Sequence, residues 1–147
     1  MIYEHKQKGK LMIIVLFATI ILFSFIFFQS GFDPILGLFM IFILFIIFSF
    51  SSLTVSLYSE NIIIRFTCKL LKKEFSLGDV DSVKSVKNKW YFGWGIRGWF
   101  WPKYMWIYNV SGFDAVELTM KNGKIYRIGT DEPKKLEGEI LKLINKK

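Results

Sequence analysis

The sequence is poor in the residues that most often carry chemistry. It holds one cysteine, Cys68, and one histidine, His5, in 147 residues. A single cysteine excludes an internal disulfide, which agrees with a reducing compartment. No Cys/His cluster is present to hold zinc, and we interpret Cys68 as a small core residue on the apolar face of a strand. We therefore expect no catalytic, metal-binding or cofactor-binding centre, and no enzymatic activity.

Charge is missing from two long stretches. No charged residue occurs from Leu11 to Phe28 or from Ile35 to Phe50, and as helices these runs extend about 27 and 24 Å. The hydrocarbon core of a membrane is roughly 30 Å thick. A signal peptide is disfavoured because a second apolar run follows the first and no small-x-small cleavage site is seen. Two buried core helices are disfavoured because the rest of the chain is too small to cover them.

The two runs predict a hairpin of transmembrane helices over residues 11–29 and 35–52, joined by a tight turn with Gly31 and Pro34. Three lysines precede the first helix, whereas the turn carries only Asp33. The positive-inside rule then places both chain termini in the cytoplasm. We expect a multi-pass protein of the cell inner (cytoplasmic) membrane, with a basic cytoplasmic N-terminus over residues 1–10.

Residues 53–147 differ in pattern and predict a cytoplasmic domain. Apolar and polar side chains alternate over 53–59, 62–69 and 70–77, which is typical of strands with one buried face. The stretch 79–86 repeats valine every third residue, so a short strand and a turn are both open. The chain carries a net charge of +8, which attracts such a domain toward an anionic leaflet.

The clearest hairpin signal is the Asn-Gly pair in AVELTMKNGKIYRIG. A two-residue loop would set Leu118 opposite Arg127, an apolar side chain facing a charge. A three-residue loop over 121–123 sets Leu118 opposite Tyr126 and Glu117 opposite Arg127. Because register follows the hydrophobic pattern, we predict the second arrangement. We expect the Glu117–Arg127 pair to be solvated.

The end of the chain predicts one amphipathic helix. Thr130 or Asp131 is the expected cap and Pro133 is tolerated near the start. Its apolar stripe consists of Leu136, Ile140, Leu143 and Ile144. The stripe needs a partner, and the open end of a strongly bent sheet supplies one.

Several segments resemble bacterial membrane proteins that carry a pleckstrin-homology-like (PH-like) domain. They are WYFGWGIR, IYNVSGFDAVEL, the Asn-Gly hairpin and IGTDEP before the last helix. The resemblance implies a membrane α-hairpin followed by an α+β domain, with a PH-like barrel of about seven antiparallel strands and one C-terminal capping helix. Lipid-binding members of the wider family hold phosphates with basic residues in the first strand connection. That connection here is 59–61, Ser-Glu-Asn, which has no cation.

All five tryptophans lie between Trp90 and Trp106. Three interpretations stay open and can coexist: packing into the barrel core, contact with the membrane interface, and docking of a protein. In the packing interpretation Trp90, Tyr91 and Trp106 enter the core. The residues predicted to contact a membrane or partner are Trp94, Arg97, Trp99, Phe100, Trp101 and Lys103. GWGIRG matches a dinucleotide fingerprint in letters only, because no βαβ unit surrounds it.

Together these patterns predict a membrane-anchored binding or scaffolding protein. The expected partners are the lipid bilayer and, as an alternative for the tryptophan segment, another protein or a second copy of the chain. We expect no nucleic-acid partner, because no recognition helix or arginine cluster is present. An accessory subunit of a membrane enzyme or transporter is the alternative function. The uncharged spans weigh against it, since transport sites usually carry a charge.

Overall fold

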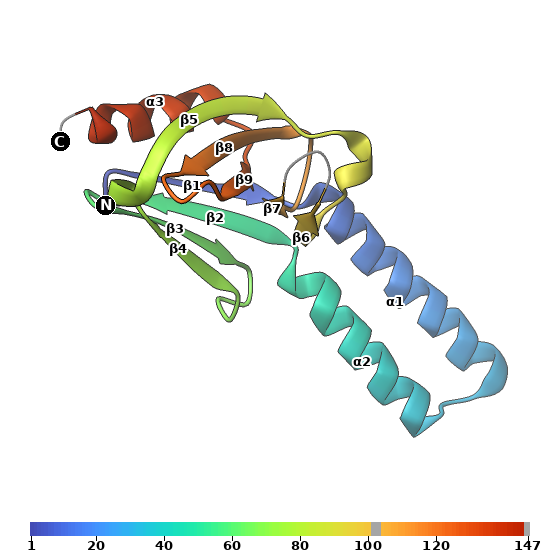
Figure 1. The fold of residues 1–147 in the computed structure, drawn as a ribbon. Coiled ribbons are helices and arrows are strands. Elements are labelled where there is room, and N and C mark those ends of the chain that lie inside the picture. The colour runs from blue at the N-terminus through green and yellow to red at the C-terminus, as the bar shows by residue number, and fades with distance from the viewer. Residues whose placement is uncertain (101–103, 146–147) are drawn as a thin grey trace.

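The computed structural model describes residues 1–100 and 104–145. These residues form nine strands in two sheets and three α-helices, two of which project as a hairpin (Figure 1). In chain order the elements are β1 (Tyr3–Lys8), α1 (Lys10–Ser30), α2 (Pro34–Ser49), β2 (Ser52–Leu57), β3 (Asn61–Phe66), β4 (Lys72–Ser76), β5 (Val80–Lys87), β6 (Gly95–Trp99), β7 (Met105–Asn109), β8 (Asp114–Met120), β9 (Ile125–Gly129) and α3 (Pro133–Ile144). Two single-turn 3₁₀ helices, η1 (Leu77–Asp79) and η2 (Trp90–Phe92), flank β5.

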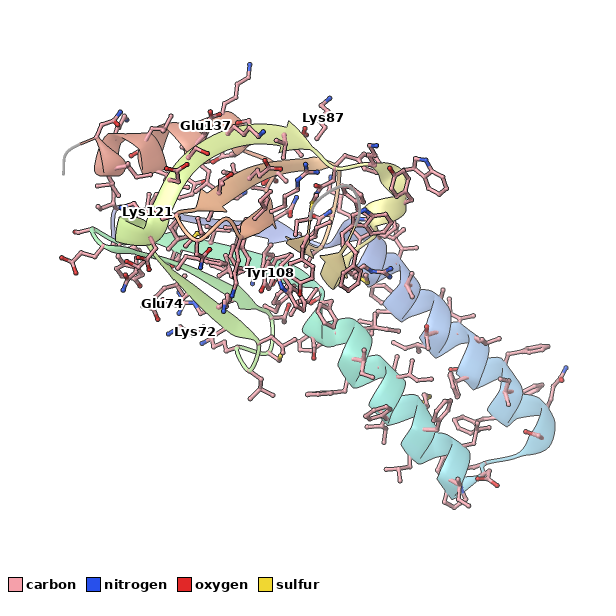
Figure 2. All side chains as sticks on the ribbon, in the orientation of Figure 1. Lys72, Glu74, Lys87, Tyr108, Lys121 and Glu137 are labelled. Atoms are coloured by element: carbon pink, nitrogen blue, oxygen red, sulfur yellow. The ribbon has the colours of Figure 1, made fainter. Side chains whose placement is uncertain are left out.

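The helical hairpin forms where the uncharged runs predict it. Helix α2 begins sharply because the Asp33 carboxylate accepts hydrogen bonds from the backbone amides of Ile35 and Leu36 at 2.8 and 2.9 Å. It ends at Ser49, before the predicted 52, because the next residues lead into β2. By length and composition α1 can cross a membrane, whereas α2 is apolar but shorter. Figure 2 shows their side chains projecting outward around both helices.

The N-terminal residues hold a strand that the sequence pattern does not reveal. β1 pairs antiparallel with β2, with Lys8 opposite Ser52, and the Gly9 amide donates to the Ser51 carbonyl at 2.8 Å. The hairpin is therefore inserted between two neighbouring strands of one sheet. The sequence pattern does not predict this strand because its buried residues are Tyr3 and Gln7 rather than a series of aliphatic side chains.

The strands pair in the orders β1-β2-β3-β4 and β5-β8-β9-β7-β6. The expected α+β class is confirmed, with two helices near the N-terminus and one at the C-terminal end. The details differ from a barrel of about seven antiparallel strands. Nine strands are described, β7 and β9 pair in parallel, and the two sheets do not pair into one closed barrel. The ambiguous segment 79–86 lies mostly in β5.

The predicted β8–β9 register is confirmed. Leu118 lies opposite Tyr126, and Glu117 lies opposite Arg127. The turn is possible because Gly123 has a φ of +81°, a left-handed conformation that costs glycine little.

The main core lies between the sheets and under α3. It contains alternate residues of both sheets, such as Ile64 and Leu118, together with Leu136 and Ile140 from the helix stripe. The second sheet also buries apolar side chains on its other face, in a smaller cluster of Phe92, Met105, Ile107 and Ile125. We call this other face the outer face of the second sheet.

Candidate functional site

A row of charged side chains crosses the outer face of the second sheet. Strand pairing sets Lys84 opposite Glu117, and Glu117 opposite Arg127. Lys84 Nζ lies 3.1 Å from one carboxylate oxygen of Glu117, and Arg127 Nε donates to the other at 2.8 Å. The prediction that this ion pair is solvated is wrong. The Glu117 side chain is only 7% exposed and that of Arg127 only 16%. Two adjacent cations make burial of the carboxylate tolerable.

The chain between β5 and β6 lies against this row. The Asn88 Oδ1 accepts from Arg127 Nη1 at 3.3 Å, and the guanidinium carbon lies 5.5 Å from the centre of the Phe92 ring. Burial by itself raises the pKa of Glu117, but the hydrogen bonds from Arg127 and Lys84 outweigh it, and the net pKa is lowered. Glu117 is therefore ionised at neutral pH and orders Arg127.

The aromatic rings that are buried differ from those that the packing interpretation places in the core. Trp90 is 77% exposed and Tyr91 is also exposed, so neither enters the core. Phe92 is buried instead, and half-buried Trp99 lies 5.4 and 5.0 Å from the ring centres of Tyr91 and Phe92. Trp106 is half-buried against the main core. The rings at the start of the segment therefore form an exposed edge above a small buried cluster.

The described residues among those predicted to contact a membrane or partner differ in exposure. Phe100 is 78% exposed, and exposed Arg97 donates from Nε to the Trp94 carbonyl at 3.3 Å. Trp94 is half-buried, and its Nε1 has no hydrogen-bond partner among the described residues. Trp101 and Lys103 lie outside the described residues.

Glycines allow the chain to turn from η2 into the edge strand β6. Gly93 and Gly95 have φ values of +69° and +98°, which other residues rarely adopt. The GWGIRG sequence therefore belongs to a turn and an edge strand, and the next described element is the strand β7. An ideal Cβ on Gly95 would lie 3.9 Å from the Phe50 side chain at the end of α2. This places the start of β6 at the base of the helical hairpin.

A pocket of about 350 Å³ opens beside the charged row. It is lined by Lys87, Lys89, Tyr91, Phe92, Trp99, Met105 and Arg127. Lys89 Nζ lies 5.5 Å from the centre of the Tyr91 ring. Sequence reasoning singled out Trp99 but missed the three cations, although two lysines directly precede the aromatic run. We call these seven residues the aromatic–cationic pocket.

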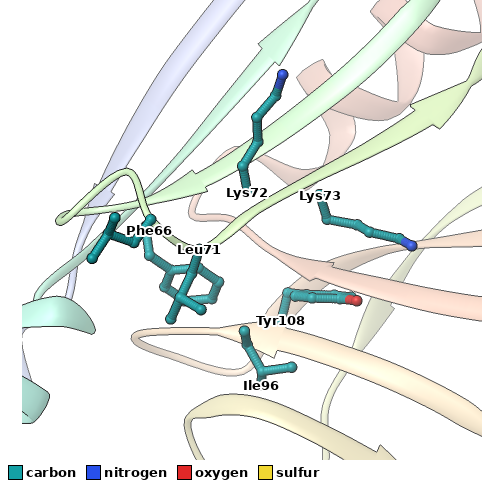
Figure 3. A pocket seen from close by; sticks show the side chains of 7 residues that line it. Phe66, Leu71, Lys72, Lys73, Ile96 and Tyr108 are labelled. Carbon is teal, nitrogen blue, oxygen red and sulfur yellow. The ribbon is translucent and has the colours of Figure 1, made fainter.

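A second, smaller pocket of about 180 Å³ lies between the β3–β4 turn and the second sheet (Figure 3). Phe66, Leu71 and Ile96 give it an apolar wall, and Lys73 extends near Tyr108. Burial raises the pKa of Tyr108, so its hydroxyl stays protonated at neutral pH. Cys68 lies in this turn and is half-buried, which corrects its expected place in a strand.

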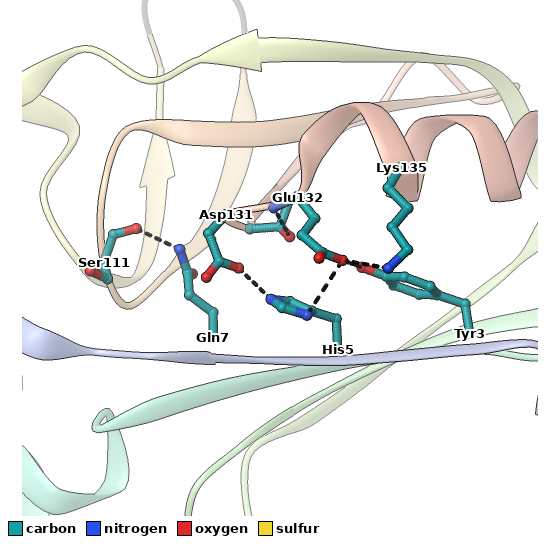
Figure 4. Close-up of polar contacts among 8 residues, drawn as sticks. Tyr3, His5, Gln7, Ser111, Asp131, Glu132 and Lys135 are labelled. Carbon is teal, nitrogen blue, oxygen red and sulfur yellow. Dashed lines mark hydrogen bonds and ion pairs between the residues drawn. The ribbon is translucent and has the colours of Figure 1, made fainter.

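Polar contacts fasten β1 to the start of α3 (Figure 4). The Tyr3 hydroxyl donates to Glu132 at 3.2 Å, and the His5 ring contacts both Asp131 and Glu132. Gln7 Nε2 donates to the Ser111 carbonyl at 3.0 Å. The N-terminal strand is thus held by its sheet and by the C-terminal part of the chain. The cluster therefore contributes to the fold.

Within residues 1–100 and 104–145, no group of three or more His, Cys, Asp or Glu side chains is placed to hold a metal ion. Comparison of the chain with protein-family models, curated proteins and solved structures gives no match. The function therefore has to be inferred from the residues and their geometry.

Proposed function

We propose that the chain is a membrane-anchored binding or scaffolding protein. The observation that carries the proposal is the apolar hairpin inserted between β1 and β2. In α1 only Phe23 is buried, and in α2 only Gly37 and Ser49, so aliphatic and aromatic side chains face outward around both helices. Such a surface is unfavourable in water and suits a bilayer. The sheets then rest close to the membrane surface, because both helices join the same end of the paired strands β1 and β2.

The orientation follows from charge. Lysines lie on β1 and at the start of α1, whereas the turn at the other end of the hairpin carries only Asp33. We infer that the sheets lie on the cytoplasmic side of the inner membrane and the hairpin turn on the opposite side. A short second helix is accommodated by local thinning of the bilayer or by the interfacial residues that follow it.

The proposal includes a PH-like relationship for the sheets and α3. It is supported by two mostly antiparallel sheets that enclose one core, with α3 packed on β5 and β8. The parallel β7–β9 pair and the strand before the hairpin depart from the expected pattern. Within such a fold, binding is the role that the aromatic–cationic pocket supports best.

Fractionation and cysteine labelling test the proposal. The full chain should stay in bacterial membranes after alkaline carbonate extraction. In a Cys68→Ser background, a cysteine placed by Ser30→Cys at the hairpin turn should react with a membrane-impermeant maleimide in intact cells. The same reagent should label Cys68 of the natural chain only after permeabilisation. Release of the chain by carbonate would refute anchoring, and the opposite labelling pattern would refute the orientation alone.

A further inference from the structure

The aromatic–cationic pocket has the chemistry of an anion site. Arg127 is held in place by Glu117 and Asn88, and its guanidinium has five donors in all. Lys87 and Lys89 have no carboxylate partner within 4.0 Å among the described residues. Two lysines without partners beside a fixed arginine suit a compact anion with several acceptor oxygens, as in a phosphate group.

The nearby acids do not cancel this charge. Glu117 is shared between Lys84 and Arg127, and Asp114 lies opposite Lys87 in the β5–β8 register. Four cations lie in this region, namely the two pocket lysines together with Lys84 and Arg127. They outnumber the two acids, so the local charge is positive. Asn88, which fixes Arg127 beside the pocket, is itself buried.

The rest of the pocket suits a ligand with an apolar part. Tyr91, Phe92 and Trp99 present ring surfaces, and Met105 adds a flexible apolar side chain. A free phosphate ion would leave these surfaces without a partner. A phosphate ester joined to a glycerol or acyl portion uses both the cations and the rings.

The pocket lies at the end of the sheets from which the hairpin projects. In Figure 1 the yellow segment between β5 and β6 lies at the same end of the molecule as the start of α1, and Figure 2 shows Lys87 at the end of β5 that leads to this segment. Gly95 lies next to Phe50 at the base of α2. We propose that the pocket binds the phosphate-bearing headgroup of an anionic phospholipid. The phosphate chemistry stands on the pocket alone, whereas the lipid source rests on the membrane anchoring proposed above.

The full chain, purified in an uncharged detergent, allows a direct test by isothermal titration calorimetry. The probes are short-chain phosphatidylglycerol below its micelle concentration, short-chain phosphatidylcholine, glycerol 3-phosphate and inorganic phosphate. A Lys87→Gln/Lys89→Gln variant should bind phosphatidylglycerol about tenfold or more weakly, because it loses two charge-assisted contacts. The matched control is Lys121→Gln/Lys124→Gln, which removes the same charge from the exposed β8–β9 turn, at the end away from the hairpin (Figure 2). It should bind within about twofold of the natural chain, because exposed lysines remote from the pocket contribute little.

A Tyr91→Ala variant tests the apolar half of the site. It should weaken phosphatidylglycerol binding while leaving the weak binding of inorganic phosphate unchanged. Equal affinity for phosphatidylcholine would show binding that does not depend on the net charge of the lipid. Equal loss in the control variant would show charge attraction without a site. Either result would overturn the proposal. Glycerol 3-phosphate binding as tightly as phosphatidylglycerol would overturn the lipid assignment in favour of a soluble phosphate ester. Because the titration is done in detergent, its failure is separate from a failure of carbonate-resistant anchoring.

Discussion

The helical hairpin and the two sheets are both rich in aliphatic and aromatic residues, but these side chains are exposed in the hairpin and buried in the sheets. In the sheets, apolar side chains alternate with polar ones and the apolar set is buried, as at Ile62 and Ile64 of β3. In α1 and α2 the apolar residues cover the whole circumference and stay exposed, as at Ile41. The sheets bury their apolar side chains within the chain itself. The hairpin does not bury its apolar side chains, and such a surface is unfavourable in water.

The most drastic way to break this contrast is to remove the hairpin and keep the sheets. Because Gly9 already bonds to Ser51 across the β1–β2 pair, an Asn-Gly turn in place of residues 10–50 should close an ordinary β-hairpin. We expect the shortened chain to move completely from the membrane to the soluble fraction and to keep its β-rich circular dichroism.

A chain that starts at Leu53 is the matched control for that experiment. It also lacks the hairpin, but it loses β1 and exposes the edge of β2, so it should aggregate. A well-folded, monomeric fragment from Leu53 would contradict the role assigned to β1. Size-exclusion chromatography of the two shortened chains separates these outcomes.

The same substitution placed in each region should have unequal effects. Ile64→Ala removes a side chain that is fully buried between the sheets, and should lower the free energy of unfolding of the sheets by about 2 to 5 kcal/mol. Ile41→Ala lies on the exposed surface of α2, and should leave that free energy unchanged. Denaturant titration of the full chain in detergent, followed by tryptophan fluorescence, measures both. Equal losses would mean that the hairpin and sheets unfold as one unit.

The buried carboxylate of Glu117 gives the sheets a pH dependence that the apolar hairpin is expected to lack. Glu117→Gln should cost about 3 kcal/mol at pH 7, because Arg127 loses its buried counter-charge. The pKa of Glu117 is lower in the folded chain than in the unfolded one, so its stabilisation is complete above the unfolded value of about 4.3. It is lost as the pH falls through the folded pKa.

The natural chain and the Glu117→Gln variant should therefore converge in stability as the pH falls below about 4. Chemical denaturation at a series of pH values checks this. A constant difference between them across that range would show that the side chain matters by shape rather than by charge. Lys84→Gln removes the more exposed of the two cations, and should have a smaller effect of the same sign.

The smallest expected effect concerns a single turn. Gly123→Ala leaves both strands unchanged but places a side chain on a turn residue with a φ of +81°. It should lower the free energy of unfolding by about 1 kcal/mol. Gly138→Ala is a useful comparison, because Gly138 lies in α3 and an added Cβ meets nothing within 4 Å. That change should stabilise the chain by a similar amount. Thermal unfolding of both variants tests the sign of each.

Much of the fold could be predicted because it depends on local patterns. Uncharged runs revealed α1 and α2, alternation revealed β2 and β3, and the Asn-Gly pair with its flanking residues revealed the β8–β9 register. The parallel β7–β9 pair could not be predicted, since β8, which follows β7 in the chain, pairs with β5 and β9 instead of with β7. β1 could not either, because its contacts with β2 and α3 involve residues more than a hundred positions apart or across the hairpin.

The candidate site was predicted only in part. The aromatic composition pointed to Trp99, which does line the pocket, but also suggested rings that lie apart from it. Lys87, Lys89 and Arg127 come together only because β9 pairs beside β8 and the η2 segment lies against them. Taken singly in the sequence, each is an ordinary surface cation.

The amino-acid sequence by itself determined the periodicity of each segment: an apolar hairpin without charge, strands with one buried face, and an amphipathic final helix. These follow from hydrophobicity and backbone preference, which act over a few residues. The tertiary structure alone decided that the hairpin interrupts a sheet, that Glu117 is buried and not solvated, and that cations meet aromatic rings beside it. Those outcomes depend on which strands become neighbours, and that is settled by the packing of the whole chain.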